Sequence, residues 1–214
     1  MDVYLERGTK RVFAGAPDWP GWARAGRNDE AALEALVASG PRYAAASKGT
    51  RLGFRAPRSV DELEVVARMT GTSTTDFGAP DVEAPGDRDD VDEPELRRLV
   101  TILRASWRAF DRAVDAAEGV ELATGPRGGG RSLEKIVAHV VDSEGGYLAR
   151  IGARAPTGDL GTERAAVIDA LERAVREGIP PAPRGGKRWT PRYFVRRSAW
   201  HVLDHAWEIE DRIG

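Results

Sequence analysis

Apolar side chains recur with two different periods along the chain, and the change of period divides it into two halves. Short alternating or β-rich stretches at residues 3–5, 11–14, 21–25 and 63–69 predict strands in the first half. They surround a single helical pattern over residues 29–46, for which Asn28 is the expected N-cap. Residues 1–77 are therefore predicted to form a small α+β domain.

The segment between the two halves, residues 78–92, is rich in proline, glycine and acidic side chains and contains few apolar residues. This composition is typical of a solvated linker. We therefore expect two domains joined by an acidic segment.

Four helical patterns follow in the second half, at about residues 93–118, 132–152, 162–177 and 190–213. Asp92, Ser132 and Thr190 precede three of these patterns as N-caps. Amphipathic helices in succession can bury their apolar faces only against one another. The predicted fold class is α+β, in which the small N-terminal domain is followed by an up-down four-helix bundle at residues 93–214.

The last helical pattern is apolar on two opposite faces, because residues advance by about 100° along a helix. One face carries Tyr193, Trp200, Leu203 and Trp207, and the opposite face carries Phe194, Val202, Ile209 and the two histidines of this helix. Only one face can serve the bundle core, so the other needs a second partner. We favour the N-terminal domain, because a tethered neighbour has a high effective concentration. In addition to this packing within one chain, we consider a homodimer that forms through the bundle.

Composition and charge narrow the classes of function. The 214 residues are 41% hydrophobic, and 32 basic against 34 acidic side chains leave a net charge of −2, which argues against a nucleic-acid partner. The lack of cysteine excludes disulfide scaffolds, iron–sulfur clusters, thiolate zinc sites and a cysteine nucleophile. A secretory h-region and runs of about 18 apolar residues are also lacking, so we expect a cytoplasmic protein with no membrane partner.

The sequence has three histidines, and two of them lie four residues apart in the last predicted helix. Positions i and i+4 share a helix face, so His201 and His205 can converge on one ion, and His139 can complete the set from a neighbouring helix. Three neutral imidazoles suit a first-row divalent metal ion. The alternative is that they are ordinary core or surface histidines. His139 favours this alternative, because it lies roughly 120° from the middle of the apolar stripe of its helix.

Glu144 is an acidic residue within the apolar stripe of the second predicted bundle helix. A carboxylate at such a position must be paired, protonated or bound to a metal ion. One interpretation makes Glu144 a candidate catalytic residue: a fourth ligand, a partner of a ligand, or a general base beside the metal ion. The other makes it the buried partner of an arginine such as Arg196.

Basic side chains lead directly into the last helix, at Arg184, Lys187, Arg188, Arg192, Arg196 and Arg197. A functional interpretation is an anion-binding mouth in which Arg192, Arg196 and Arg197 bind a carboxylate or phosphate of a small-molecule substrate beside the metal ion. The alternative is a solvated basic face that balances the acidic linker.

The segments around the histidines carry a family resemblance. One is IVAHVVDSEGGYL, which contains His139, and the other is RRSAWHVLDHAWEIEDR, which contains His201 and His205. One histidine in the second helix and His-x-x-x-His in the last is the pattern of the DinB-like (damage-inducible) four-helix metalloproteins, which residues 93–213 resemble. The resemblance implies a divalent metal ion, commonly zinc, nickel, manganese or iron, near one end of the bundle with open coordination positions.

A second resemblance covers about residues 10–40, in VFAGAPDWPGWARAGRNDEAALEAL. A strand, a Pro-Asp-x-Pro-Gly turn and a glycine before an acidic-start helix make this stretch similar to the core of HicB-like antitoxin domains. A helix-turn-helix or ribbon DNA-binding pattern does not follow it. We therefore interpret the module as a scaffold that helps to close the metal site.

These features favour a metal-dependent enzyme that acts on a small molecule. Three histidine ligands without cysteine describe an open, catalytic-type site better than a closed structural one. The resemblance implies a thiol-dependent transferase or isomerase, or a hydrolase, and a low-molecular-weight thiol would have to arrive as a cosubstrate. The alternative is a non-enzymatic module, either a metal-stabilised interaction protein or a regulatory partner.

Overall fold

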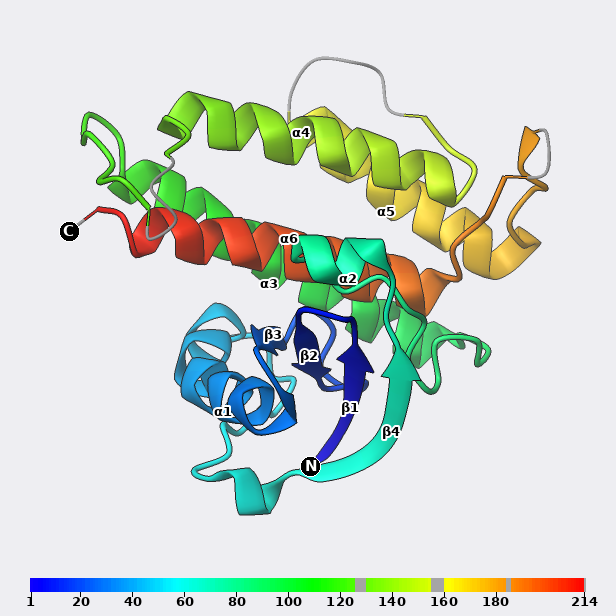
Figure 1. Ribbon diagram of the computed structural model, residues 1–214. Coiled ribbons are helices and arrows are strands. Elements are labelled where there is room, and N and C mark those ends of the chain that lie inside the picture. Colours follow the sequence, from blue (N-terminus) through cyan, green and yellow to red (C-terminus); the bar gives the residue numbers. More distant parts are fainter. Residues whose placement is uncertain (126–129, 155–159, 184–185, 214) are drawn as a thin grey trace.

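The N-terminal part of the protein is built on a four-stranded sheet, and the computed structural model describes residues 1–125, 130–154, 160–183 and 186–213 (Figure 1). The strands are β1 (Asp2–Arg7), β2 (Val12–Gly15), β3 (Ala23–Gly26) and β4 (Glu64–Thr70), in the order β3-β2-β1-β4. Strand β1 pairs antiparallel with β2 and parallel with β4, and β2 pairs antiparallel with β3. All four strand predictions are confirmed, and so is the mixed α+β class.

Helix α1 (Asp29–Ala46) covers one face of this sheet. Its start is confirmed at the predicted cap, because the Asn28 side chain accepts a hydrogen bond from the Ala31 N–H at 2.9 Å. Ala32 and Leu36 of α1 are fully buried together with Val3 and Leu5 of β1. Two short elements lie outside the predictions: a single 3₁₀ turn (Val60–Glu62) and helix α2 (Ser73–Phe77).

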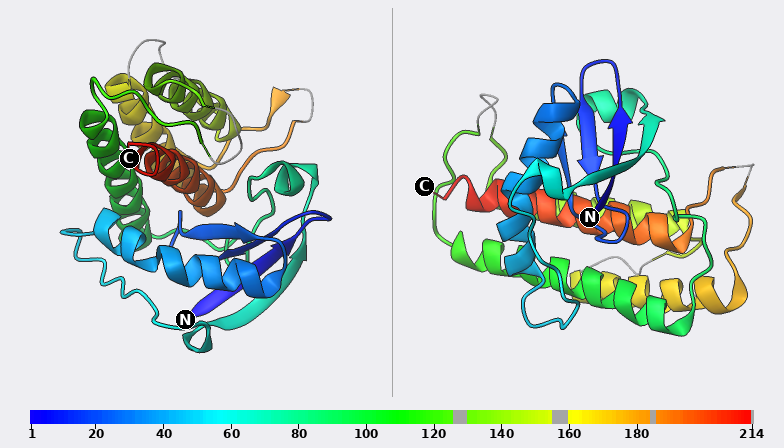
Figure 2. Two further views of the ribbon diagram at one scale, coloured as in Figure 1. Left: turned by 60° about the vertical axis from the view of Figure 1, so that its left-hand side comes forward. Right: turned by 90° about the horizontal axis from the view of Figure 1, so that it is seen from below.

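The second half contributes the long helices α3 (Glu93–Ala116), α4 (Leu133–Arg150), α5 (Leu160–Glu177) and α6 (Pro191–Glu210). They lie together on one side of the sheet (Figure 2). Helix α6 packs against α3, α4 and α5. Within the described part of the chain, none of the helices has the length and apolar character needed to cross a membrane.

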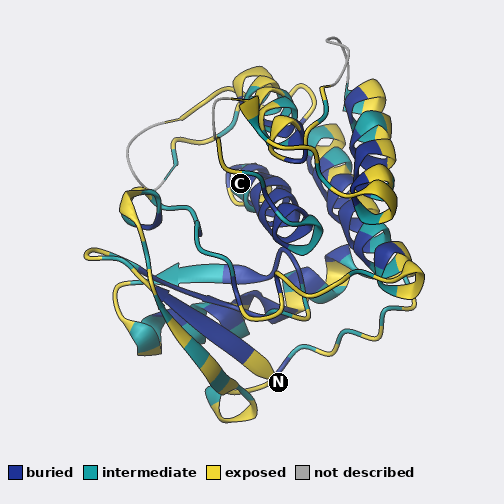
Figure 3. Ribbon diagram, turned by 90° about the vertical axis from the view of Figure 1, so that its right-hand side faces the viewer, coloured by how far each residue is buried: buried dark blue, intermediate teal, exposed yellow. Residues whose placement is uncertain are grey.

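Helix α6 also packs on the sheet, which explains why its sequence is apolar on two faces. It is buried along nearly its whole length (Figure 3). Trp200 packs with Phe13 of β2 and Ala23 of β3, and the Trp200 and Phe13 rings meet edge to face with centroids 5.9 Å apart. The expectation that the N-terminal domain covers this face is therefore confirmed, whereas the homodimer stays a prediction.

The loop before β3 approaches α6 so closely that it requires glycine. Gly21 has φ 93°, and a Cβ atom there would lie 2.9 Å from the Ala199 Cβ. An L side chain is disfavoured at this φ and would collide with α6. Gly21 therefore lets the N-terminal domain sit directly on the helix that carries two of the histidines.

The segment at residues 78–92 is less solvated than its composition predicts. Ala84 and Asp87 are only 6% and 5% exposed. Glu6 of β1, fully buried, accepts hydrogen bonds from the N–H groups of Asp81 and Val82. The prediction of a solvated linker is wrong at these positions, because the segment is held between the sheet and α6.

Candidate metal centre

The structure brings the three histidines together. His139 comes from α4, His201 and His205 come from consecutive turns of α6, and one nitrogen of each lies within 4.8 Å of the others. The Nε2 atoms of His139 and His201 are 3.2 Å apart. The convergence that the i, i+4 spacing predicts is thus observed between two packed helices.

The spacing of these nitrogens is suitable for a metal ion. Bonds of about 2.0–2.1 Å at a tetrahedral angle place two ligand nitrogens about 3.4 Å apart, close to the observed 3.2 Å. His201 is 6% exposed, and its Nδ1 atom has no hydrogen-bond partner among the described residues. The Nε2 atom of this imidazole faces Nε2 of His139, so that both Nε2 atoms could bind one cation. The three residues therefore fit a divalent cation in donor type and in spacing.

The electrostatics of the cluster keep its imidazoles in the form that binds metal ions. Burial, and then the neighbouring His205, lower the pKa of His139 below its ordinary value. The same two causes, followed by the Arg197 guanidinium, lower the pKa of His201 much further. Metal ligation needs the neutral imidazole, so both side chains are prepared for it near neutral pH.

Glu208 orients one of the three histidines, and the sequence analysis missed it. Its Oε2 atom lies 2.8 Å from His205 Nδ1, which leaves Nε2 of His205 to face the other imidazoles. The hydrogen bond with His205 lowers the pKa of Glu208 and so favours its carboxylate form. The i, i+3 spacing from His205 to Glu208 was the signal that could have identified this carboxylate.

Glu144 lies in a different polar cluster, between α3, α4 and α5. Its carboxylate accepts a hydrogen bond from Trp107 Nε1 at 2.5 Å and lies 3.9 Å from Arg164 Nε. The interpretation of Glu144 as the buried partner of an arginine is therefore supported, but the arginine is Arg164 of α5 and not Arg196. None of the contacts described for Glu144 involves a histidine, so its catalytic role stays a prediction without structural support.

The environment of Glu144 makes folding stability depend on pH. Burial raises its pKa from 4.5 to about 7, because burial outweighs the opposing effects of Arg164 and Trp107, and Glu163 and Asp111 raise it further. The folded state therefore binds this proton more tightly than the unfolded state does. The resulting stabilisation is fully present below pH 4.5 and is lost as the pH rises through about 7.

Replacing Glu144 by glutamine should remove this dependence. Between pH 4.5 and pH 8, the free energy of unfolding of the wild type should fall by about 3 kcal/mol relative to that of Glu144→Gln, at about 1.4 kcal/mol per pKa unit. Urea denaturation at a series of pH values measures the difference. The exposed Glu118→Gln provides the matched control. If the free energy of unfolding changed with pH by the same amount in the wild type and in Glu144→Gln, the burial argument would be contradicted.

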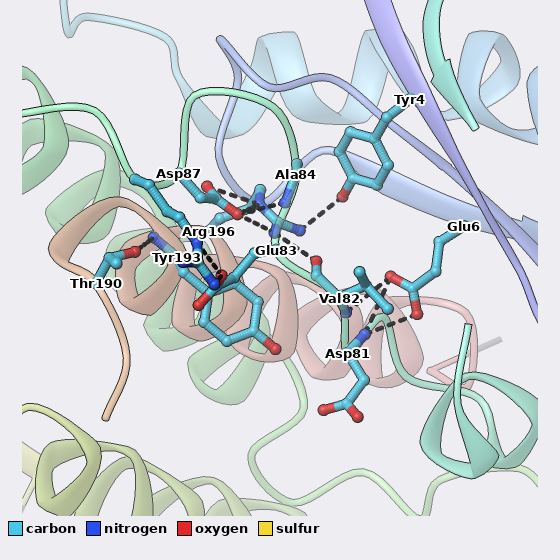
Figure 4. Close-up of polar contacts among 11 residues, drawn as sticks. Tyr4, Glu6, Asp81, Val82, Glu83, Ala84, Asp87, Thr190, Tyr193 and Arg196 are labelled. Atoms are coloured by element: carbon cyan, nitrogen blue, oxygen red, sulfur yellow. Dashed lines mark hydrogen bonds and ion pairs between the residues drawn. The ribbon is translucent and has the colours of Figure 1, made fainter. Parts of the chain in front are cut away.

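Two of the three candidate substrate-binding arginines already have acidic partners. Arg192 donates to Glu95 Oε1 at 2.5 Å. Arg196, 3% exposed, forms an ion pair with Asp87 and donates to the Tyr4 hydroxyl and the Val82 carbonyl, both at 2.8 Å (Figure 4). A solvated basic face is therefore the wrong description of Arg196, which instead joins the sheet to α6. Arg184 lies outside the described residues.

Arg197 has different surroundings. It is 7% exposed, and its guanidinium lies over the rings of Tyr147 and Trp200, 5.4 Å and 4.7 Å from their centroids. The Tyr147 ring in turn contacts the His201 ring, with centroids 5.5 Å apart. Of the three arginines, Arg197 is therefore the one that borders the histidine cluster.

No family model matches this chain, and neither the curated proteins nor the solved structures contain a match. The chemistry of the site is therefore indicated by the histidine cluster itself. Three imidazoles converge there, one of them oriented by Glu208, and the buried Arg197 lies beside them.

Proposed function

We propose that this protein binds a divalent metal ion through His139, His201 and His205 and is a metal-dependent enzyme acting on a small molecule. The observation that carries the proposal is the approach of one nitrogen from each histidine to within 4.8 Å of the others. Three nitrogen ligands leave coordination positions for a substrate. When bound, such an ion supplies Lewis-acid activation of water or of an external thiol.

The proposal includes the DinB-like architecture, an up-down four-helix bundle formed by α3 to α6. The packing of α6 against the other three helices supports it. In this arrangement His139 and the pair on α6 hold the ion between two helices, and Glu208 fixes the orientation of His205.

The reaction we propose is a thiol-dependent transfer or isomerisation, with hydrolysis as the other candidate. Because the chain contains no cysteine, the thiol would be a separate small molecule. Zinc, nickel, manganese and iron are the candidate ions, since imidazole is a suitable ligand for first-row divalent metals.

Metal content tests the first part of the proposal. Protein purified without a histidine tag should retain about one divalent ion per chain, measured by elemental mass spectrometry. Replacing His201 and His205 together by alanine should reduce the content at least tenfold, because one remaining imidazole cannot hold the ion.

The control is Lys135→Ala, an exposed change on the same helix as His139. Circular dichroism should show that both variants keep their helices. Stoichiometric metal in the double histidine variant would overturn the assignment of the site.

A structural ion in a non-enzymatic module is the alternative, since the site joins two helices. Cobalt-substituted protein distinguishes a structural ion from an open, catalytic-type site. An open site should change its visible spectrum when azide or a small thiol is added, because free coordination positions accept the ligand. A spectrum indifferent to both would favour the structural ion.

A further inference from the structure

Arg197 is a buried cation for which the described part of the chain shows no ion pair. It is 7% exposed, and its Nη1 atom has no hydrogen-bond partner within the described ranges. Arg192 and Arg196, its neighbours on α6, each form an ion pair, whereas the described contacts of Arg197 are with aromatic rings. Burying a charge without a partner is costly. We therefore expect a negatively charged partner for Arg197 that comes from outside the described part of the chain.

The unsatisfied nitrogen of Arg197 belongs to a group of such atoms. Trp200 Nε1 and His201 Nδ1 are also buried and lack hydrogen-bond partners among the residues that the structure describes. The three side chains are in contact, since the guanidinium lies over the Trp200 ring and the Trp200 and His201 rings are 6.4 Å apart. Arginine and tryptophan can only donate hydrogen bonds. A ligand that satisfies this group must therefore be an acceptor.

Charge and shape indicate which acceptor fits. Glu208 brings one negative charge to the histidine cluster, and Arg212, which donates to Glu208 Oε1, brings one positive charge. A bound divalent cation together with Arg197 would therefore leave the site with a net positive charge. A guanidinium pairs with a carboxylate through two parallel hydrogen bonds. The guanidinium lies over the Tyr147 and Trp200 rings, and one guanidinium neutralises one carboxylate.

Tyr147, unlike Arg197 and Trp200, is only partly buried. The two residues before it on α4, Gly145 and Gly146, lack side chains, and a Cβ atom at Gly146 would meet nothing within 4 Å. Glycines inside a helix lower its stability by about 1 kcal/mol each. We therefore expect the turn of α4 that carries Tyr147 to be less stable than a turn without glycine.

We propose that Arg197 binds the carboxylate of a small-molecule ligand beside the three histidines. This inference rests on the proposed function and specifies its substrate class, an organic monocarboxylate. Arg197 holds the carboxylate and thereby fixes the rest of the molecule next to the histidine cluster, while Tyr147 and Trp200 form the walls.

Binding of benzoate and benzamide to metal-free wild-type protein tests this inference by calorimetry. The two probes have the same shape, and only benzoate carries the charge. Benzoate should bind at least about tenfold more tightly, the effect of one charge-assisted pair. Equal affinities, or no binding of benzoate, would overturn the proposal. Tighter binding of phenyl phosphate than of benzoate would replace carboxylate by phosphate as the ligand group.

Variants then locate the binding site. Arg197→Met should weaken benzoate binding at least about tenfold, and Arg197→Lys should weaken it less, because lysine keeps the charge but not the paired donors. The matched control is Arg108→Met, an exposed arginine on α3, which should bind benzoate like the wild type. Unchanged affinity in Arg197→Met would place the carboxylate elsewhere and overturn the proposal. If Arg197→Met does not fold, the affinity of Arg197→Lys for benzoate and the comparison of benzoate with benzamide still test the proposal.

Metal content, measured on each protein as purified and before the metal is removed for calorimetry, separates this inference from the proposed function. Loss of benzoate binding in Arg197→Met with full metal retention supports both. A wild type that binds benzoate through Arg197 but holds no metal would refute the proposed function and leave the carboxylate site intact. Metal retention without any preference for benzoate would refute the carboxylate site alone.

Discussion

Asp87→Ala should destabilise the protein by about 3–5 kcal/mol, the range observed when one partner of a buried ion pair is removed. Arg196 and Asp87 are 3% and 5% exposed, so the remaining guanidinium would stay buried without its counter-charge. The Ala84 N–H would also lose its acceptor, since it donates to Asp87 at 2.6 Å. Urea denaturation followed by circular dichroism measures the loss.

A double variant and a matched control show whether the loss comes from the uncompensated charge. Asp87→Ala combined with Arg196→Met should recover part of the stability, because the buried cation is removed as well. The exposed Asp89→Ala in the same segment should change the free energy of unfolding by less than about 0.5 kcal/mol. If Asp87→Ala lowers the free energy of unfolding no more than Asp89→Ala does, the segment at residues 78–92 does not hold the sheet against α6.

The elements that were predictable from the sequence are those determined by local patterns. Short alternating or β-rich stretches predicted the four strands, and helical periodicity with caps such as Asn28, Asp92 and Thr190 predicted the long helices. The short α2 was missed, although Thr72 and Thr75 form a capping box at its start. That signal is also local, but five residues are too few for periodicity to indicate a helix.

The partners of buried charges were not predictable in the same way. Arg196 meets Asp87 and Tyr4 only because α6 docks on the sheet, and these residues are 109 and 192 positions away. Glu144 meets Arg164 only because α4 packs beside α5. The histidine cluster was easier to predict, because the i, i+4 spacing within one helix already places two of its three members together.

Trp200→Ala should cost about 3–5 kcal/mol of stability and leave the mass of the protein in solution unchanged. Trp200 is 5% exposed and fills the junction between α6 and the sheet, where it packs on Phe13 and Ala23. Its removal leaves a cavity between two parts of the same chain, so folding is weakened and association is not. Denaturation in urea measures the stability, and sedimentation measures the mass.

Phe77→Ala is the matched control, because Phe77 is an aromatic side chain that is 85% exposed at the end of α2. It should leave the free energy of unfolding within about 0.5 kcal/mol of the wild type. A change of mass in Trp200→Ala would contradict the structure, since it would mean that a second chain covers this face of α6. Unchanged mass with a large loss of stability would show that the N-terminal sheet is a structural partner of α6, the helix that carries His201 and His205. A substitution in the sheet would then also weaken the support of the histidine cluster.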